Sequence, residues 1–183
     1  MKLKVILQSL LVCALTSFAH VANAGVIFTA TLSGDQEVPS VDTTATGSAM
    51  GELTGTAGAY VFTYEINYSG LSSPIVDIFG GGHFHNASTG VNGPVVHLFD
   101  TTDFAFLGTT NGTISGDWRF DDASNPLTDE LANELKAGNM YINLHTEIFN
   151  PGELRGQLFA VPEPAVLLLV ASGLLFAAGR KRS

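Results

Sequence analysis

The sequence predicts an all-β domain: an antiparallel β-sandwich or flattened barrel that carries one short helix. Segment 61–68 alternates polar residues with Phe62, Tyr64, Ile66 and Tyr68, and a period of two is typical of a strand with one buried face. Further short apolar segments, separated by glycine and asparagine, occupy 26–32, 46–53, 75–79, 94–99, 113–120, 140–146 and 154–160. Many short strands at this spacing are typical of sandwiches and barrels.

A single segment departs from the strand pattern and predicts the helix. Leu127, Leu131 and Leu135 recur at intervals of four residues, which places them on one face of a helix. Acidic residues come early in the segment, Lys136 comes late and Gly138 follows, as expected for charges matched to the helix dipole and a glycine stop. We expect this helix to cover one end of the sandwich.

The N-terminal segment has the features of a signal peptide rather than of folded structure. A basic start precedes an apolar run over 5–18, and the small residues Ala22 and Ala24 form the pattern that signal peptidase recognises. We expect cleavage after Ala24 and export of the remaining chain across the inner membrane.

Cysteine usage and charge restrict what the exported domain can do. The only cysteine, Cys13, lies in the signal peptide, so the domain has no disulfide, no cysteine-ligated zinc and no thiol nucleophile. Between residues 35 and 163, all 17 acidic residues stand against only Arg119, Lys136 and Arg155. Such a surface repels nucleic acid and anionic membranes, which excludes nucleic-acid binding.

The C-terminal segment has the pattern of a sorting signal. It contains, in order, Pro162-Glu163-Pro164, an apolar run over 165–179 and the basic cluster Arg180-Lys181-Arg182. Basic residues after an apolar run stay on the cytoplasmic side, which predicts a membrane helix over 165–179 with the domain outside. The combination resembles the PEP-CTERM sorting signal of Gram-negative bacteria. The resemblance implies transient anchoring in the inner membrane, cleavage near the Pro-Glu-Pro motif by an exosortase, and delivery to the cell surface or the extracellular polysaccharide.

Several stretches of the central segment resemble the CHRD domain, first recognised in chordin. They are 30–39 (ATLSGDQEVP), 82–86 (GHFHN), 90–96 (GVNGPVV), 138–146 (GNMYINLHT) and 151–158 (PGELRGQL). The resemblance covers nearly the whole central segment and implies an immunoglobulin-like β-barrel, while it leaves the activity open. We therefore expect a signal peptide over 1–24, a CHRD-like domain over 25–160 and a sorting tail over 161–183.

Three histidines in these stretches are candidate metal ligands. In a strand, His83 and His85 point to one face and Phe84 to the other. If Phe84 and Leu144 enter the core, His145 points outward as well, and three imidazoles could converge on zinc or copper. A His-x-His pair on a β-barrel also occurs in Cu/Zn superoxide dismutase, which is an analogy of fold alone. The alternative, three polar residues on the surface without a ligand, stays open.

Other polar residues give weaker signals. His97 has the parity of Val95 and Phe99 and is a candidate fourth ligand, and Glu153 and Arg155 share a strand face, which predicts an ion pair that fixes the last hairpin. The sequence contains no Gly-x-Ser-x-Gly, phosphate loop or His-Glu-x-x-His motif, so we assign no catalytic residue.

Two functions are compatible with these features. The first is an exported, non-catalytic surface or matrix module that binds extracellular polysaccharide or a surface protein, with or without a histidine-bound metal. The second is a copper or zinc metalloenzyme of the cell envelope that uses His83, His85 and His145. The two sorting signals and the absence of a nucleophile motif favour the first.

Overall fold

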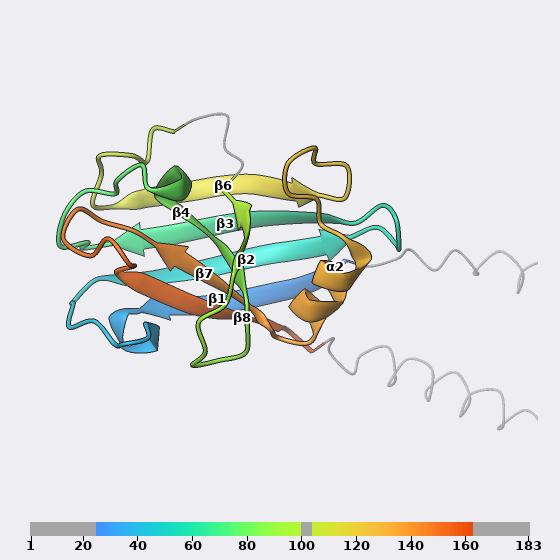
Figure 1. The fold of residues 1–183 in the computed structure, drawn as a ribbon, viewed down its shortest axis with the longest axis horizontal. Coiled ribbons are helices and arrows are strands. Elements are labelled where there is room, and N and C mark those ends of the chain that lie inside the picture. Colours follow the sequence, from blue (N-terminus) through green and yellow to red (C-terminus); the bar gives the residue numbers. More distant parts are fainter. Residues whose placement is uncertain (1–24, 100–103, 163–183) are drawn as a thin grey trace, which may run out of the picture.

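The computed structural model describes residues 25–99 and 104–162, which adopt the expected all-β fold (Figure 1). Eight strands of these residues form one antiparallel sheet in the order β5-β4-β7-β8-β1-β2-β3-β6. The sheet bends over on itself, so that β4 and β7 cross in front of β1, β2 and β3 in Figure 1. The result is a nearly closed, flattened barrel with one helix at its end.

The strands lie largely where the alternation predicts them. A short 3₁₀ turn at Gly34–Gln36 follows β1 and begins the loop that leads to β2. A second 3₁₀ turn, at Phe79–Gly81, directly precedes β4. The elements are β1 (Val26–Ser33), β2 (Thr46–Thr54), β3 (Val61–Ser69), β4 (Gly82–Asn86), β5 (Val95–Leu98), β6 (Gly112–Arg119), α2 (Asp129–Lys136), β7 (Met140–Leu144) and β8 (Leu154–Ala160).

An aromatic core joins the two layers of the barrel. The predicted alternation of β3 is confirmed, because Phe62, Tyr64, Ile66 and Tyr68 are all buried. Phe84 of β4 meets this row from the opposite layer, with its ring centre 4.9 Å from that of Tyr64 and 6.0 Å from that of Phe62. Edge-to-face contacts of this kind stabilise a core beyond the area they bury.

Side chains close the barrel between its two edge strands. β5 and β6 lie at opposite ends of the strand order. Trp118 of β6 stacks on His97 of β5, with ring centres 4.9 Å apart and planes 14° apart, and it also stacks on Phe84 at 5.8 Å. These stacked rings form an aromatic seam that holds β5 and β6 together, although these two strands are not hydrogen-bonded neighbours in the sheet.

The predicted helix is confirmed as α2. The Thr128 hydroxyl accepts a hydrogen bond from Leu131 N at 3.2 Å, and this cap satisfies one of the free amides of the first turn. Gly138 adopts a φ of 78°, a conformation that glycine tolerates best, and so ends the helix. Leu127 and Leu135 are fully buried at the end of the barrel.

One predicted strand is wrong. Segment 75–79 joins the sheet only through an isolated bridge between Ile75 and Thr146. Ile75 N donates instead to Thr109 O at 3.0 Å, and its side chain is buried. The apolar run therefore reflects burial beneath the loop at 104–110 rather than pairing in a strand.

The two predicted targeting segments lie outside the described residues. These are the signal peptide over 1–24 and most of the sorting tail, including the expected membrane helix over 165–179. Within 25–99 and 104–162, no helix is long and apolar enough to span a membrane.

The packing predicts a large difference between two equivalent substitutions. Leu144→Ala removes a fully buried side chain from β7 and should lower the free energy of unfolding by about 2–5 kcal/mol. Leu98→Ala, the matched control, removes the same atoms from a side chain that is 37% exposed in β5 and should cost far less. Denaturant unfolding of both variants measures the difference, and equal costs would mean that the faces of β7 are assigned incorrectly.

Candidate functional site

The candidate site is the outer face of β4, β7 and β8, which carries polar side chains in two rows. Register places His83 opposite Asn143, and Asn143 opposite Arg155. The second row contains His85, Tyr141 and Gln157. We call these six residues, with His145 just beyond the end of β7, the histidine face. Because side chains alternate along a strand, this face lies opposite the aromatic core.

The histidine face is buried, although it is polar. Loop 34–45 and loop 87–94 lie over it, and Asn92 joins the two loops by donating to Val38 O at 2.8 Å. His83 is 2% exposed, His145 5% and Arg155 1%. The sequence predicts histidines on an open outer surface. The histidine side chains do point away from the aromatic core, as predicted, whereas their expected exposure to solvent is wrong.

Two of the three predicted ligands meet directly. His83 Nε2 and His145 Nε2 are hydrogen-bonded at 3.2 Å, and their ring centres are separated by 4.6 Å. The third, His85, lies beside His83 with a ring-centre separation of 4.5 Å. Strand pairing brings His83 and His145 together from positions 62 residues apart in the sequence.

Backbone carbonyls fix the ring orientation of two of these histidines. His85 Nδ1 lies 2.8 Å from Gly93 O, and His145 Nδ1 lies 2.7 Å from Asn150 O. A carbonyl oxygen only accepts, so each Nδ1 carries the hydrogen and each neutral ring presents a lone pair at Nε2. Metal-ligating histidines are commonly oriented in this way by a partner on the second ring nitrogen.

Burial also favours the neutral form of these rings. It lowers the pKa of His145, with the hydrogen bond to Asn150 acting in the opposite direction. Burial likewise lowers the pKa of His85, and the nearby His145 and Arg155 lower it further. Neutral imidazole is the form that binds a metal ion.

The present side-chain positions do not form a complete metal centre. Among the described residues, no three His, Cys, Asp or Glu side chains are arranged to hold one ion together. The separation of His83 and His145 alone fits two ligands of one ion, since bonds of 2.0–2.1 Å in a tetrahedron place two nitrogens about 3.3 Å apart.

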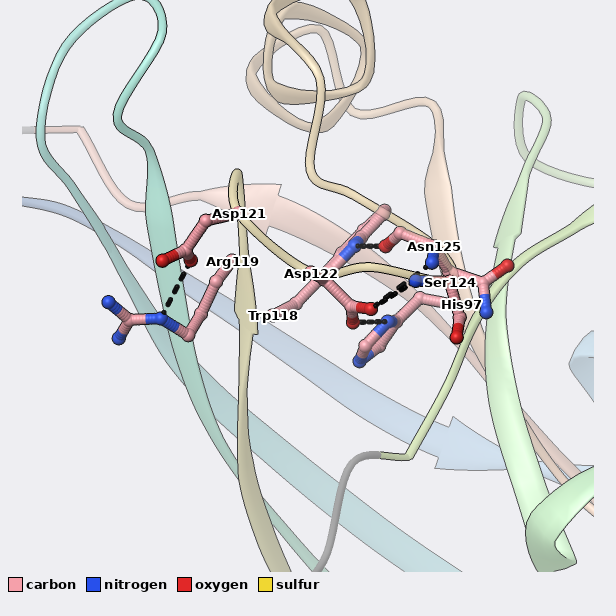
Figure 2. A network of polar contacts seen from close by, with 7 residues as sticks. All are labelled: His97, Trp118, Arg119, Asp121, Asp122, Ser124 and Asn125. Atoms are coloured by element: carbon pink, nitrogen blue, oxygen red, sulfur yellow. Dashed lines mark hydrogen bonds and ion pairs between the residues drawn. The ribbon is translucent and has the colours of Figure 1, made fainter.

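His97 does not belong to this cluster, so its assignment as a fourth ligand is wrong. It pairs with Phe84 across β4 and β5 and therefore lies on the core side of the sheet. Figure 2 shows its ring beside Asp122, with His97 Nδ1 at 3.6 Å from Asp122 Oδ2. Hydrogen bonds from Ser124 N and Asn125 N lower the pKa of Asp122 and hold it as an anion at the seam.

Arg155 clamps loop 87–94 onto the histidine face. Its guanidinium donates to Asn92 Oδ1 at 3.0 Å and to Val91 O at 2.8 Å, and it lies 3.5 Å above the ring of Tyr141. The next residue of the loop, Gly93, provides the carbonyl that orients His85. A planar guanidinium supplies these donors in a fixed geometry that an ammonium cannot reproduce.

The predicted ion pair between Glu153 and Arg155 is wrong. Glu153 accepts hydrogen bonds from Thr43 Oγ1, from the amide and hydroxyl of Ser72, and from Thr146 Oγ1, all between 2.7 and 2.8 Å. Burial alone would raise the pKa of Glu153, but these hydrogen bonds outweigh it and hold the pKa below its ordinary value. Glu153 therefore fastens three loops as an anion, independently of Arg155.

A second buried carboxyl, Glu37, lies over the centre of the histidine face. Asn143 Nδ2 donates to Glu37 Oε2 at 3.3 Å. Burial raises the pKa of Glu37 to about 7, although Arg155 and the hydrogen bond from Asn143 oppose the shift. Sequence reasoning missed Glu37 because it lies in a loop without periodicity. Its only signal was its place in the opening stretch that resembles the CHRD domain.

A groove of about 1080 Å³ lies over β1, β2 and β3 and reaches Gln157 at the edge of the histidine face. Its walls include hydroxyl and amide side chains such as Thr31, Ser48 and Asn67. Two large apolar side chains, Met50 at 60% and Phe159 at 53% exposure, border it.

The fold and this site define a small all-β barrel with a buried histidine face, joined to a C-terminal sorting sequence. A family model for the CHRD domain matches residues 28–158, and the chain belongs to the CHRD domain family. The PEP-CTERM protein-sorting motif matches residues 160–183. No curated protein matches the chain. The sorting motif implies a protein that is exported, directed to the cell envelope and processed by an exosortase.

The clamp predicts that Arg155 cannot be replaced by lysine. Arg155→Lys should lower the free energy of unfolding by about 2–3 kcal/mol, because a buried ammonium cannot reach both acceptors of loop 87–94 and keeps unpaired donors. The matched control, Arg119→Lys, changes an exposed arginine that pairs with Asp117 and Asp121 and should leave stability nearly unchanged. Nitrogen-15 NMR of the His85 ring should also change from one tautomer to a mixture in Arg155→Lys. A single tautomer in that variant would contradict the clamp.

Proposed function

We propose that this protein is an exported cell-surface module that binds one zinc or copper ion through His83, His145 and His85. The observation that supports the proposal best is the 3.2 Å separation of His83 Nε2 and His145 Nε2. It suits two nitrogen ligands of one ion, and both side chains are buried beside the paired strands β4 and β7.

His85 would complete the ligand set after a small shift of its ring. Its Nδ1 hydrogen bond to Gly93 O leaves Nε2 as the ligand atom, and its ring lies 4.5 Å from that of His83. Tyr141 stacks on His85 with the planes 4° apart, so the ring can slide along a flat neighbour without leaving the site. Three imidazoles without a thiolate or carboxylate suit zinc or copper rather than calcium or magnesium.

A binding role fits this site better than catalysis. A catalytic metal keeps a coordination position that substrate can reach. His83 and His145 are at most 5% exposed, and the backbone of Asn150 lies against the His145 ring. We therefore propose that the ion stabilises the module, and that polysaccharide or a surface protein contacts its exterior, including the groove over β1, β2 and β3.

The proposal predicts metal binding that depends on particular histidines. The purified protein should bind one zinc or copper ion per chain, measured by elemental analysis and calorimetric titration. His83→Gln and His145→Gln should each weaken binding at least about 100-fold, beyond the usual effect of losing an outer partner of a ligand. His97→Gln is the matched control and should keep the affinity, because His97 lies on the core side. Equal loss in folded His97→Gln, or no binding by the unaltered protein, would refute the proposal.

The proposed location predicts processing at both ends of the chain. Mass spectrometry of the protein from its native host should find an N-terminus at Gly25, because Ala22 and Ala24 form the signal-peptidase pattern. The C-terminus should lie between residues 161 and 164. Recovery of surface protein that still carries the basic cluster 180–182 would contradict the sorting step.

A further inference from the structure

We propose that Glu37 carries a proton in the folded protein and donates it to Asn143, which fastens loop 34–45 across the histidine face. This inference concerns a group that the proposed metal site does not use. It stands or fails separately from metal binding.

The geometry places two hydrogen-bond acceptors against each other. Asn143 Nδ2 donates to Glu37 Oε2 at 3.3 Å, so the amide edge faces the carboxyl edge. The remaining oxygens, Glu37 Oε1 and Asn143 Oδ1, are buried and have no hydrogen-bond partner among the described residues. Two buried oxygens that both lack a donor cost free energy, and a proton held between them would remove that cost.

Gly152 lies next to both oxygens. It adopts a φ of 138°, and a side chain at this position would collide with both Asn143 Oδ1 and Glu37 Oε1. The two oxygens therefore converge on one small space next to the glycine backbone. A neutral carboxyl supplies the donor that these two oxygens lack. Its hydroxyl donates to the amide oxygen, while its carbonyl oxygen accepts from the amide nitrogen.

A reversed amide or a bound cation fits this geometry less well than a proton. Reversing the Asn143 amide exchanges its oxygen and nitrogen but still leaves one oxygen of each group facing the other. A bound cation would need more oxygen ligands than the two available, since calcium takes six to eight. The positive charge of Arg155, which acts on Glu37, would also oppose a cation.

The positive charge of Arg155 opposes the proton on Glu37, and burial outweighs it. Arg155 of β8 is the charged group that acts on it, and its guanidinium is already occupied by Val91 O, Asn92 Oδ1 and the Tyr141 ring. The other acid of this region, Glu153, is turned towards Thr43, Ser72 and Thr146. Just after β7, His145 is directed to His83 and Asn150.

The proton makes the fastening of loop 34–45 dependent on pH. Burial raises the pKa of Glu37 from 4.5 to about 7, so the folded protein keeps a proton that the unfolded chain has lost. The stabilisation is complete below the ordinary pKa of 4.5 and is lost as the pH rises through about 7. Loop 34–45 also holds loop 87–94 through Val38 and Asn92, so loosening it would uncover the histidine face at alkaline pH.

Substitution of Glu37 by glutamine tests the proton directly. The glutamine amide donates to Asn143 at every pH, as the neutral carboxyl does. The unfolding equilibrium constant of the purified unaltered protein should rise at least about tenfold between pH 5 and pH 8 through this group, and Glu37→Gln should remove that part of the pH dependence. Glu37→Gln should therefore match the unaltered protein at pH 5 and be more stable at pH 8.

Glu153→Gln is the matched control, since it alters a buried carboxyl that must stay ionised. Its four donors would face an amide group, so this variant should be less stable than the unaltered protein at pH 8, opposite to Glu37→Gln. Carbon-13 NMR of the Glu37 carboxyl in the unaltered protein gives an independent reading if a variant fails to fold. A carboxyl signal that is fully ionised at pH 5, or an unchanged pH dependence in folded Glu37→Gln, would overturn the proposal.

Discussion

A polar sheet face is buried on β4, β7 and β8, and most of the remaining structure follows from the need to satisfy it. Buried polar groups are costly unless each finds a partner, and loops supply those partners here. Arg155 binds Val91 O and Asn92, Gln157 donates to Ala87 O and Gly138 O, and His85 binds Gly93 O. The path of loop 87–94 is therefore set by side chains of the sheet that it covers.

The central strand β7 shows how two kinds of packing stabilise one element. All five of its residues are buried. Ile142 and Leu144 pack into the aromatic core, while Tyr141 and Asn143 join the hydrogen-bonded face beneath the loops. The aromatic face contributes mainly the burial of apolar area, whereas the polar face accepts only a few loop conformations. A domain without cysteine thus gains a fixed loop structure without a disulfide.

The two buried carboxyls among the described residues illustrate opposite uses of the same side chain. Glu153 is surrounded by donors, which stabilise the anion. Glu37 faces an amide with one donor and one acceptor, and burial makes the neutral acid the better partner. Burial raises the pKa of both carboxyls, and the number of hydrogen-bond donors around each decides whether that shift is overcome. Both hold loops in place, so loop order over the histidine face depends on the environments of two acids.

The sequence by itself determined the features that depend on neighbouring residues. The alternation at 61–68, the leucine spacing before Gly138 and the parity of His83 and His85 are local, and they predicted the strands, the helix and the direction of these side chains. The sorting motif was equally evident, because its parts are adjacent in the chain.

Only the tertiary structure decided which strands became neighbours and what covered them. Parity could not show that His97 lies on the core side, since its pairing with Phe84 depends on a register shift between Phe84 and His85. Nor could it show that the histidine face is buried, or that Glu37 meets Asn143 across 106 residues of sequence. Such contacts arise when a loop without periodicity folds over a distant strand. The local pattern of side chains does not predict which strand that loop will cover.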